Sequence, residues 1–467
     1  MFQLIFSTLL LAISFYVVIT GVVVGKGSLV DKEELGLEEK SLNIIILIIS
    51  YITLFLNEGF QVAAMRVQYL KSSDLDMYPR TKKCHSLLFP HVDGIQTSNM
   101  PRLFIGQSFL VVLCTFLLAR LTKYDDQFEV EYCFNMEFLT HIMSSQLMGI
   151  FFTVNLAQLL PSLLAKNYPI QFLQLPMVYS LIKLALIIEN SGVVNFTYLV
   201  VEGVDKIVCG AKSGMEEKKN IKVTGMSILD VCKYTISILL TLSCVAFVLF
   251  SIGSGYSAFT STPSVQICLL IVGMSVVFYC EGLKIAVVSK YEDIAAYDES
   301  TTSNPTSPII KLLSKSNDSV ERFLLGRQQI VVPIGFLIAQ INHFDIPYLS
   351  ANLPAFVYFL LTGFGLPAVI VLLVFSQLSP QLLAAGHMEK FLRLPGSFVM
   401  VYMALIIEKL GITTAISSFV EFVKSKYPPR DVRFDQVQNP LNIHHDGEIE
   451  MLEIIDYNGD DVHDDDN

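Results

Sequence analysis

Ten apolar stretches, each long enough to cross a lipid bilayer as a helix, constrain the fold of this chain more than any other feature. A spanning helix needs about 20 mostly apolar residues. Charged residues make up only 16% of the chain, against about 25% in soluble domains. We therefore predict an all-α membrane protein with about ten transmembrane helices. The predicted spans are 3–25, 42–66, 102–124, 142–165, 175–203, 227–253, 265–289, 322–342, 353–384 and 395–423.

Three of these stretches need a further comment. The stretches 175–203 and 353–384 are longer than a straight span, so we expect tilted, kinked or broken helices there. The first stretch has no basic residues before it and no clear cleavage site. We expect it to be a retained helix, and a cleaved signal peptide is the alternative.

The second half of the chain repeats the first. Residues 172–194 match residues 391–413, and residues 158–165 match residues 377–384. Glutamines, prolines, glutamates and glycines coincide as well as leucines, which chance similarity between two apolar sequences does not explain. Each half holds five spans, an odd number, so the second copy is expected to enter the membrane in the opposite orientation. Many secondary transporters are built from such inverted repeats.

This repeat divides the chain into four predicted parts. The tail holds ten acidic residues between Asp446 and Asp466 and has no Lys or Arg after Arg433, so we expect it to be solvated and disordered. The parts are a first five-helix repeat at 1–204, a polar linker at 205–226, a second five-helix repeat at 227–424 and the acidic tail at 425–467.

Four carboxylates lie inside predicted spans and form two pairs related by the repeat. A charged side chain at the centre of a bilayer costs roughly 2.5–3.5 kcal/mol on insertion scales, so it usually marks a functional site. The alternative is a protonated side chain that only bonds neighbouring helices. We predict these residues as candidates for binding a coupling ion: Glu58 with Glu281, and Glu189 with Glu408.

Two glutamines, Gln158 and Gln377, each stand three residues before a proline inside a span. A proline frees backbone carbonyls of a helix, and these can join a ligand shell beside the amides. We predict both as polar residues at helix breaks; structural hydrogen bonding between helices is the alternative.

Four short motifs resemble those of the silicic acid transporter family known from diatoms. That family has E-G-x-Q in spans two and seven and G-R-Q in spans three and eight. Here E-G-F-Q is intact at 58–61 and G-R-Q at 326–328, whereas the partner copies read E-G-L-K at 281–284 and G-Q-S at 106–108. The resemblance covers roughly residues 1–424 and implies a substrate site built from Glu58, Gly59, Gln61, Gln107, Ser108, Glu281, Gly282, Lys284, Gly326, Arg327 and Gln328.

The resemblance implies sodium-coupled uptake of silicic acid or a similar small neutral solute with hydroxyl groups. Amides such as Gln61 and Gln328 both donate and accept hydrogen bonds, as such a solute requires. Lys284 departs from the family pattern. It stands three residues after Glu281, which predicts an ion pair between them on one helix face. Our hypothesis is that this pair replaces one of two coupling sites.

Two other functions remain open: a passive channel, and a sensor of the same fold that binds without transporting. An enzyme is not expected, because the chain has no H-E-x-x-H, P-loop or G-x-S-x-G motif. The cysteines show no metal-site spacing, so we expect no metal site and no cofactor, with Na⁺ as the coupling ion. The expected partners are a small-molecule solute and the lipid bilayer of a plasma or vesicle membrane, without nucleic acid. Oligomerisation is left open.

Overall fold

The computed structural model describes most of the two predicted repeats. The described residues are 2–24, 37–68, 70, 75–92, 95–96, 98–123, 146–209, 228–259, 261–290, 294, 308–316 and 318–428. The acidic tail beyond residue 428 and most of the predicted linker lie outside this set.

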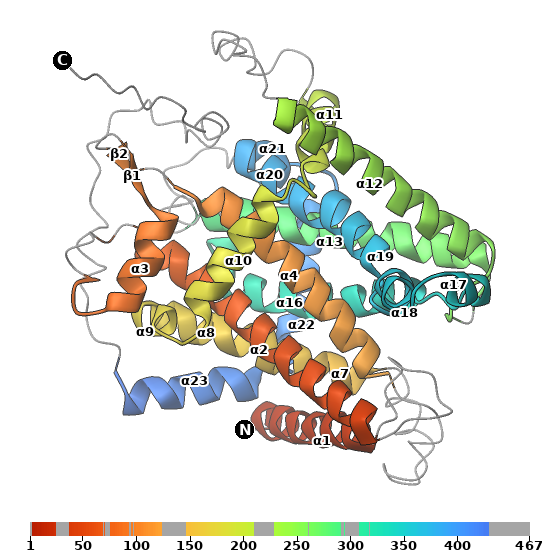
Figure 1. The fold of residues 1–467 in the computed structure, drawn as a ribbon. Coiled ribbons are helices and arrows are strands. Elements are labelled where there is room, and N and C mark those ends of the chain that lie inside the picture. The colour runs from red at the N-terminus through yellow and green to blue at the C-terminus, as the bar shows by residue number, and fades with distance from the viewer. Residues whose placement is uncertain are drawn as a thin grey trace, which may run out of the picture. The chain divides into compact units, whose positions relative to one another are not determined.

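Helices make up almost all of the described structure (Figure 1). Eight are long and apolar enough to cross a membrane, or nine if the bent pair α22 and α23 counts as one span. This confirms the all-α membrane fold, whereas the inverted orientation of the halves stays a prediction. The long elements are α1 (Phe2–Val24), α2 (Leu37–Val67), α4 (Met100–Leu121), α12 (Ile228–Gly253), α13 (Pro263–Ser289) and α16 (Ser319–Ile341).

Two further spans are composite, because each contains a π-helical segment. One is α7 (Leu147–Phe152), η2 (Thr153–Leu159) and α8 (Leu160–Asn167). The other is α19 (Leu366–Leu372), η5 (Leu373–Leu378) and α20 (Ser379–Gly386). The predicted breaks at Gln158 and Gln377 are therefore widened turns and not interruptions. Such π-bulges are frequently found at functional sites.

The stretches 175–203 and 353–384 are broken, as their lengths predicted. The first forms α10 (Val178–Asn190) and α11 (Phe196–Cys209), which are separate helices of 13 and 14 residues. The second begins with α18 (Ala355–Tyr358) and η4 (Phe359–Gly363) and turns at Gly365 (φ 67°) before α19.

The last predicted span, 395–423, is also broken, although the prediction did not single it out. It forms α22 (Ser397–Lys409) and α23 (Thr414–Lys426), which meet at 74°. Gly411 has φ 73° at this bend, and Gly192 has φ 76° at the matching break in the first half. Both values lie in the left-handed region that glycine adopts without strain.

The remaining described elements are short. They are α3 (Pro79–Leu88), β1 (His91–Val92), β2 (Ile95–Gln96), α9 (Pro169–Leu173), α15 (Pro308–Leu313), α17 (Pro347–Asn352) and α21 (Met388–Leu392). The two strands form one antiparallel pair with His91 opposite Gln96.

The final helix of each half packs against the first helix of the other half. Helix α23 contacts α1 and α8, and α11 contacts α12 and α20 (Figure 1). The Ser7 hydroxyl of α1 donates to Ile412 O (2.5 Å) and accepts from Ala415 N (3.1 Å). The Ser237 hydroxyl of α12 makes the same two bonds at the other break, to Val193 O and from Phe196 N. The two halves are thereby interlocked.

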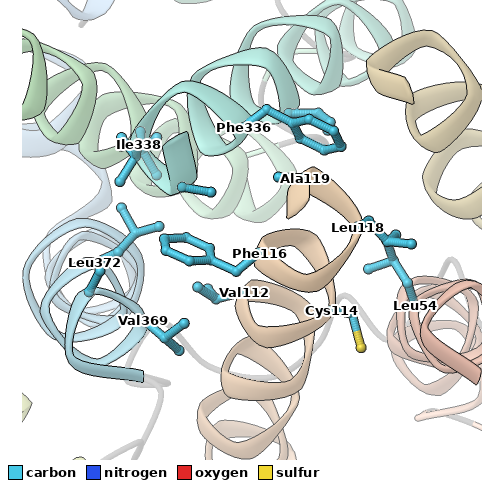
Figure 2. Packing of buried hydrophobic residues seen from close by; sticks show 14 of the residues in the cluster. Leu54, Val112, Cys114, Phe116, Leu118, Ala119, Phe336, Ile338, Val369 and Leu372 are labelled. Carbon is cyan, nitrogen blue, oxygen red and sulfur yellow. The ribbon is translucent and has the colours of Figure 1, made fainter. Parts of the chain in front are cut away.

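Helices α4 and α16 cross near their C-terminal ends. Arg120 Nη2 donates to Asn342 O (3.0 Å), and Gln340 Nε2 donates to Ala119 O (3.0 Å). The buried hydrophobic core surrounds this crossing, and Figure 2 shows the Phe116 ring pointing from α4 toward Leu372 of α19. The crossing fixes how α4 and α16 face each other in the preceding turns.

Candidate functional site

A small cavity lies where the two halves meet, between α4 and α16. Its volume is about 40 Å³. A buried site needs roughly 10–15 Å³ on this measure to hold one water molecule, so the space fits a solute of a few heavy atoms. Helices α2 and α13 and the π-helical segments η2 and η5 complete its wall.

Ten of the predicted site residues line this cavity. Five come from each half, at positions that the repeat makes equivalent. They are Glu58, Gln61, Gln107, Ser108 and Gln158 from the first half, and Glu281, Lys284, Arg327, Gln328 and Gln377 from the second. The sequence pattern therefore predicted a set of residues that the fold brings together.

The second-half carboxylate is fully engaged. Arg327 Nη1 forms a buried ion pair with Glu281 Oε1 at 2.7 Å. Gln381 Nε2 donates to the other carboxylate oxygen of Glu281 at 2.9 Å. Both members of the pair are almost fully buried, with side-chain exposures of 3% and 8%. The charge of Glu281 is thus neutralised by protein groups.

The first-half carboxylate is not engaged in this way. Glu58 is buried and lines the cavity, yet it makes no hydrogen bond or ion pair with the described part of the chain. The position equivalent to Arg327 holds Gln107, which donates to Gln61 Oε1 (3.1 Å) and Asn57 O (3.2 Å). Glu58 is therefore available to a ligand.

The predicted pair between Lys284 and Glu281 is wrong. Lys284 Nζ donates to Gln61 Oε1 at 3.0 Å, across the boundary between the halves. The i,i+3 argument considers only one helix, whereas Arg327 reaches Glu281 from α16 and occupies the place that Lys284 was expected to take. Lys284 thereby connects α13 to α2.

The three glycines of the predicted site, Gly59, Gly282 and Gly326, are placed at helix contacts and do not line the cavity. A Cβ on Gly59 would lie 2.0 Å from Phe172, and one on Gly282 would lie 2.0 Å from Phe391. A Cβ on Gly326 would lie 1.9 Å from Ala404 O. These glycines let α9, α21 and α22 pack closely against the helices that carry the polar residues.

Glu189 and Glu408 also lie away from the cavity. Each forms an ion pair with an arginine in the first turn of a neighbouring span. Arg102 bonds Glu189 at 2.8 Å, and Arg322 bonds Glu408 at 2.7 Å. These carboxylates hold α10 to α4 and α22 to α16.

The prediction omitted Gln381, the second partner of Glu281. It stands four residues after Gln377, so both amides lie on one face of the helix. Its equivalent in the first half is Ser162, whose hydroxyl donates to Gln158 O. The prediction selected motif residues and the glutamines that precede a proline, whereas Gln381 follows Pro380; the i,i+4 spacing from Gln377 is the signal that was available.

The cavity wall combines balanced formal charge with unused hydrogen-bonding capacity. Glu58 and Glu281 are matched by Lys284 and Arg327. Gln107 Oε1, Gln158 Oε1 and Arg327 Nε are buried without a hydrogen-bond partner among the described residues. Buried polar atoms are normally paired, so these atoms point to a ligand that both donates and accepts.

A fold whose described helices include eight or nine candidate spans, with a small polar cavity between its halves, has the architecture of a membrane carrier for a small solute. The family model for silicon transporters matches residues 2–218 and 225–427, and the chain belongs to this family. Neither a curated protein nor a solved structure matches the chain. Membership confirms the suggested resemblance, the integral membrane location and the expectation of a transporter in place of an enzyme.

Proposed function

We propose that this protein carries silicic acid, or a similar small neutral solute with hydroxyl groups, across the membrane together with sodium. The observation that carries the proposal is the cavity that ten of the predicted polar side chains line, five from each half. Family membership supports a small solute as the cargo. We infer the identities of the solute and of the coupling ion from the chemistry of the residues that line the cavity.

The wall suits a neutral solute that carries several hydroxyl groups. Its formal charges balance, so it has no net attraction for an ionic solute. The solute's hydroxyls donate to Gln107 Oε1 and Gln158 Oε1 and accept from Arg327 Nε, the atoms without protein partners. An unsatisfied buried polar atom costs about 1–3 kcal/mol, and binding of the solute recovers part of this cost.

The coupling ion is assigned to the first half. Glu58 is a buried carboxylate on the cavity wall without an ion pair to a described residue. A hard cation prefers oxygen ligands, and a carboxylate with neighbouring amide oxygens supplies them. Glu281 is already matched by Arg327 and Gln381, so we assign it no ion.

Uptake into proteoliposomes tests the whole proposal. Germanic or silicic acid uptake should require an inward sodium gradient and should fall at least tenfold in Gln61→Ala. The variant Lys206→Ala is the control. Lys206 is exposed and bonds Glu202 one turn away, so this variant should transport normally. If Gln61→Ala transports as well as the control, the cavity is not the solute site.

Sodium activation tests the assignment of a single cation to Glu58. Arg327 already neutralises Glu281, so wild type should show a Hill coefficient for sodium of about one. Lys284→Gln leaves the pair between Arg327 and Glu281 in place and should keep this coefficient. A coefficient near two in wild type would contradict the assignment of one ion.

Accumulation of the solute inside vesicles distinguishes the proposed carrier from a passive channel. A carrier coupled to sodium concentrates the solute inside vesicles and loses this gradient when sodium is equilibrated. A channel only equilibrates the solute, and a sensor binds it without flux. Either of these results would replace the proposed mechanism while leaving the cavity as the binding site.

A further inference from the structure

A second hollow, which shares no lining residue with the cavity, lies between α3 and the corner that joins α9 to α10. This groove has a volume of about 640 Å³. Helix α3 contributes Arg80 and Lys83, and the corner contributes Leu175, Met177 and Tyr179. Helix α3 stands between the end of the span in α2 and the start of the span in α4, so it lies at one surface of the membrane.

Helix α3 is amphipathic, with one buried face and with Arg80 and Lys83 lining the groove. The buried side chains of Thr81 and Cys84 face α9, where they donate to Ile170 O (2.8 Å) and Leu173 O (3.9 Å). Arg80 and Lys83 are three residues apart and share the adjacent face. Figure 1 shows α3 next to α9.

Both groove cations keep most of their bonding capacity. Arg80 Nη1 donates to Gln174 O at 3.2 Å, which uses one of its five donors. The amino group of Lys83 makes no contact with another described residue within bonding distance, and none of the described residues that line the groove is a carboxylate. Lys82 on the same helix does not line the groove and is paired with Asp76 at 2.6 Å.

The other wall of the groove is apolar and continues along α10. Met177, in a left-handed conformation at the corner, is 59% exposed. Leu184 and Ile187 lie on the same face of α10 and are 41% and 58% exposed. Tyr179 stands at the groove, the position between water and lipid that this residue favours in membrane proteins.

The corresponding corner of the second half is covered by a tyrosine. The Tyr279 hydroxyl donates to Pro395 O at 2.6 Å, and its ring lies 3.4 Å from where a Cβ on Gly396 would stand. The first-half equivalent of Tyr279 is Leu56, which has no hydroxyl group. The corner that lines the groove therefore lacks this contact.

We propose that this groove binds the headgroup of an anionic phospholipid, with Arg80 and Lys83 on the phosphate and the acyl chains along α10. The pairing of two uncompensated cations with an exposed apolar helix face matches a ligand that has an anionic head and long apolar chains. A soluble anion would use the cations and leave the apolar face uncovered. Basic side chains at this position attract the anionic leaflet of the membrane.

Native mass spectrometry of the full-length protein in detergent tests the proposal. Phosphatidylserine and phosphatidylcholine with identical acyl chains are titrated separately. Wild type should retain phosphatidylserine preferentially. The variant Arg80→Ala/Lys83→Ala should bind it about 25-fold more weakly, because each basic side chain near an anionic surface contributes roughly a fivefold factor.

Three controls keep the result interpretable. Lys82→Ala removes a charge from the same helix but outside the groove, and should bind phosphatidylserine as wild type does. Lys83→Ala alone should weaken binding about fivefold, and it removes no contact within the described protein, so misfolding does not explain a loss. Equal retention of both lipids, or equal binding by Lys82→Ala and the double variant, overturns the proposal. Displacement of phosphatidylserine by millimolar inorganic phosphate also overturns it, in favour of a site for soluble anions.

Discussion

The two halves of the cavity place the same carboxylate in opposite situations. In the second half, Glu281 is bound by Arg327 and Gln381. In the first half, Glu58 occupies the equivalent position and bonds neither a cation nor an amide among the described residues. The difference teaches that a repeat can preserve the shape of a site while one copy becomes structural and the other stays available for ligands.

Three exchanges between equivalent positions produce this difference. Arginine becomes glutamine from 327 to 107, and glutamine becomes serine from 381 to 162. Lysine at 284 faces glutamine at 61. The first half thus lacks an arginine, and the second half supplies a cation from the opposite side of the boundary. The cavity is formally neutral, but its charges are unevenly placed: the first half contributes one carboxylate, and the second half contributes one carboxylate and both cations.

The largest effect is expected from Arg327→Gln, which gives the second half the residue type of the first. Glu281 is left buried without its cation, and breaking one partner of a buried ion pair typically costs about 3–5 kcal/mol. The midpoint of thermal unfolding in detergent should fall strongly. The double variant Arg327→Gln/Glu281→Gln should recover most of the loss; no recovery would mean that Arg327 stabilises through other contacts.

Neutralising the two carboxylates one at a time tests the comparison directly. Glu58→Gln should leave the unfolding midpoint unchanged, because it breaks no bond within the described structure, while sodium-dependent uptake falls at least tenfold. Glu281→Gln should lower the midpoint, because Arg327 is left unpaired. Equal loss of stability in both variants would show that Glu58 is as firmly held as Glu281.

A smaller difference is expected between Gln381→Ala and Ser162→Ala. Gln381 donates to a charged carboxylate, and hydrogen bonds to charged groups contribute about 1.5–3 kcal/mol. The Ser162 hydroxyl donates to the neutral Gln158 O, for which about 0.5–1.5 kcal/mol is typical. The same unfolding measurement should rank Gln381→Ala as the more damaging change. The reverse order would contradict a stabilising hydrogen bond from Gln381 to Glu281.

The smallest effect concerns the ends of α4 and α16, where Lys123 and His343 are equivalent. Burial, with Arg120 and Lys123 nearby, lowers the pKa of His343 to about 3. Stability from this neutral histidine is full above its unfolded pKa of about 6.5 and declines as the pH falls toward 3.

Between pH 7 and pH 5, the unfolding midpoint of wild type should therefore fall further than that of His343→Gln, by about 1–2 °C per pH unit for a chain of this length. The same scan of Lys123→Gln should parallel wild type, because His343 remains in place. Parallel curves for wild type and His343→Gln would show that His343 is solvated.

Ten of the residues that recur as polar in both halves line one cavity, and their role in binding stays a prediction. The sequence reasoning failed where a partner comes from another helix or lies outside the selected motifs. Arg327 displaced Lys284 as the partner of Glu281, and Gln381 was missed because it follows Pro380 and belongs to none of those motifs. Pairings between helices depend on how the helices cross, and the spacing of residues along one helix gives no information about this crossing.

The same reasoning explains the outcome for the fold. Apolar length identified the spans, and excess length correctly indicated the broken stretches 175–203 and 353–384. The break at Gly411 was missed although 395–423 is as long as 175–203, so the same length argument applied to it. Its match to Gly192 was visible, but only the positive φ angles show that both glycines are turns.

The serine contacts between the halves also have a consequence for biosynthesis. Ser7 and its acceptor Ile412 are 405 residues apart in the chain. At a typical synthesis rate of about 5–20 residues per second, the partner of Ser7 emerges from the ribosome roughly 20–80 s after Ser7 itself. Helix α1 must wait in the membrane throughout this time with its Ser7 face uncovered. Any chaperone that assists insertion of this protein therefore has a defined helix to shield and a defined moment, the arrival of α23, at which to release it.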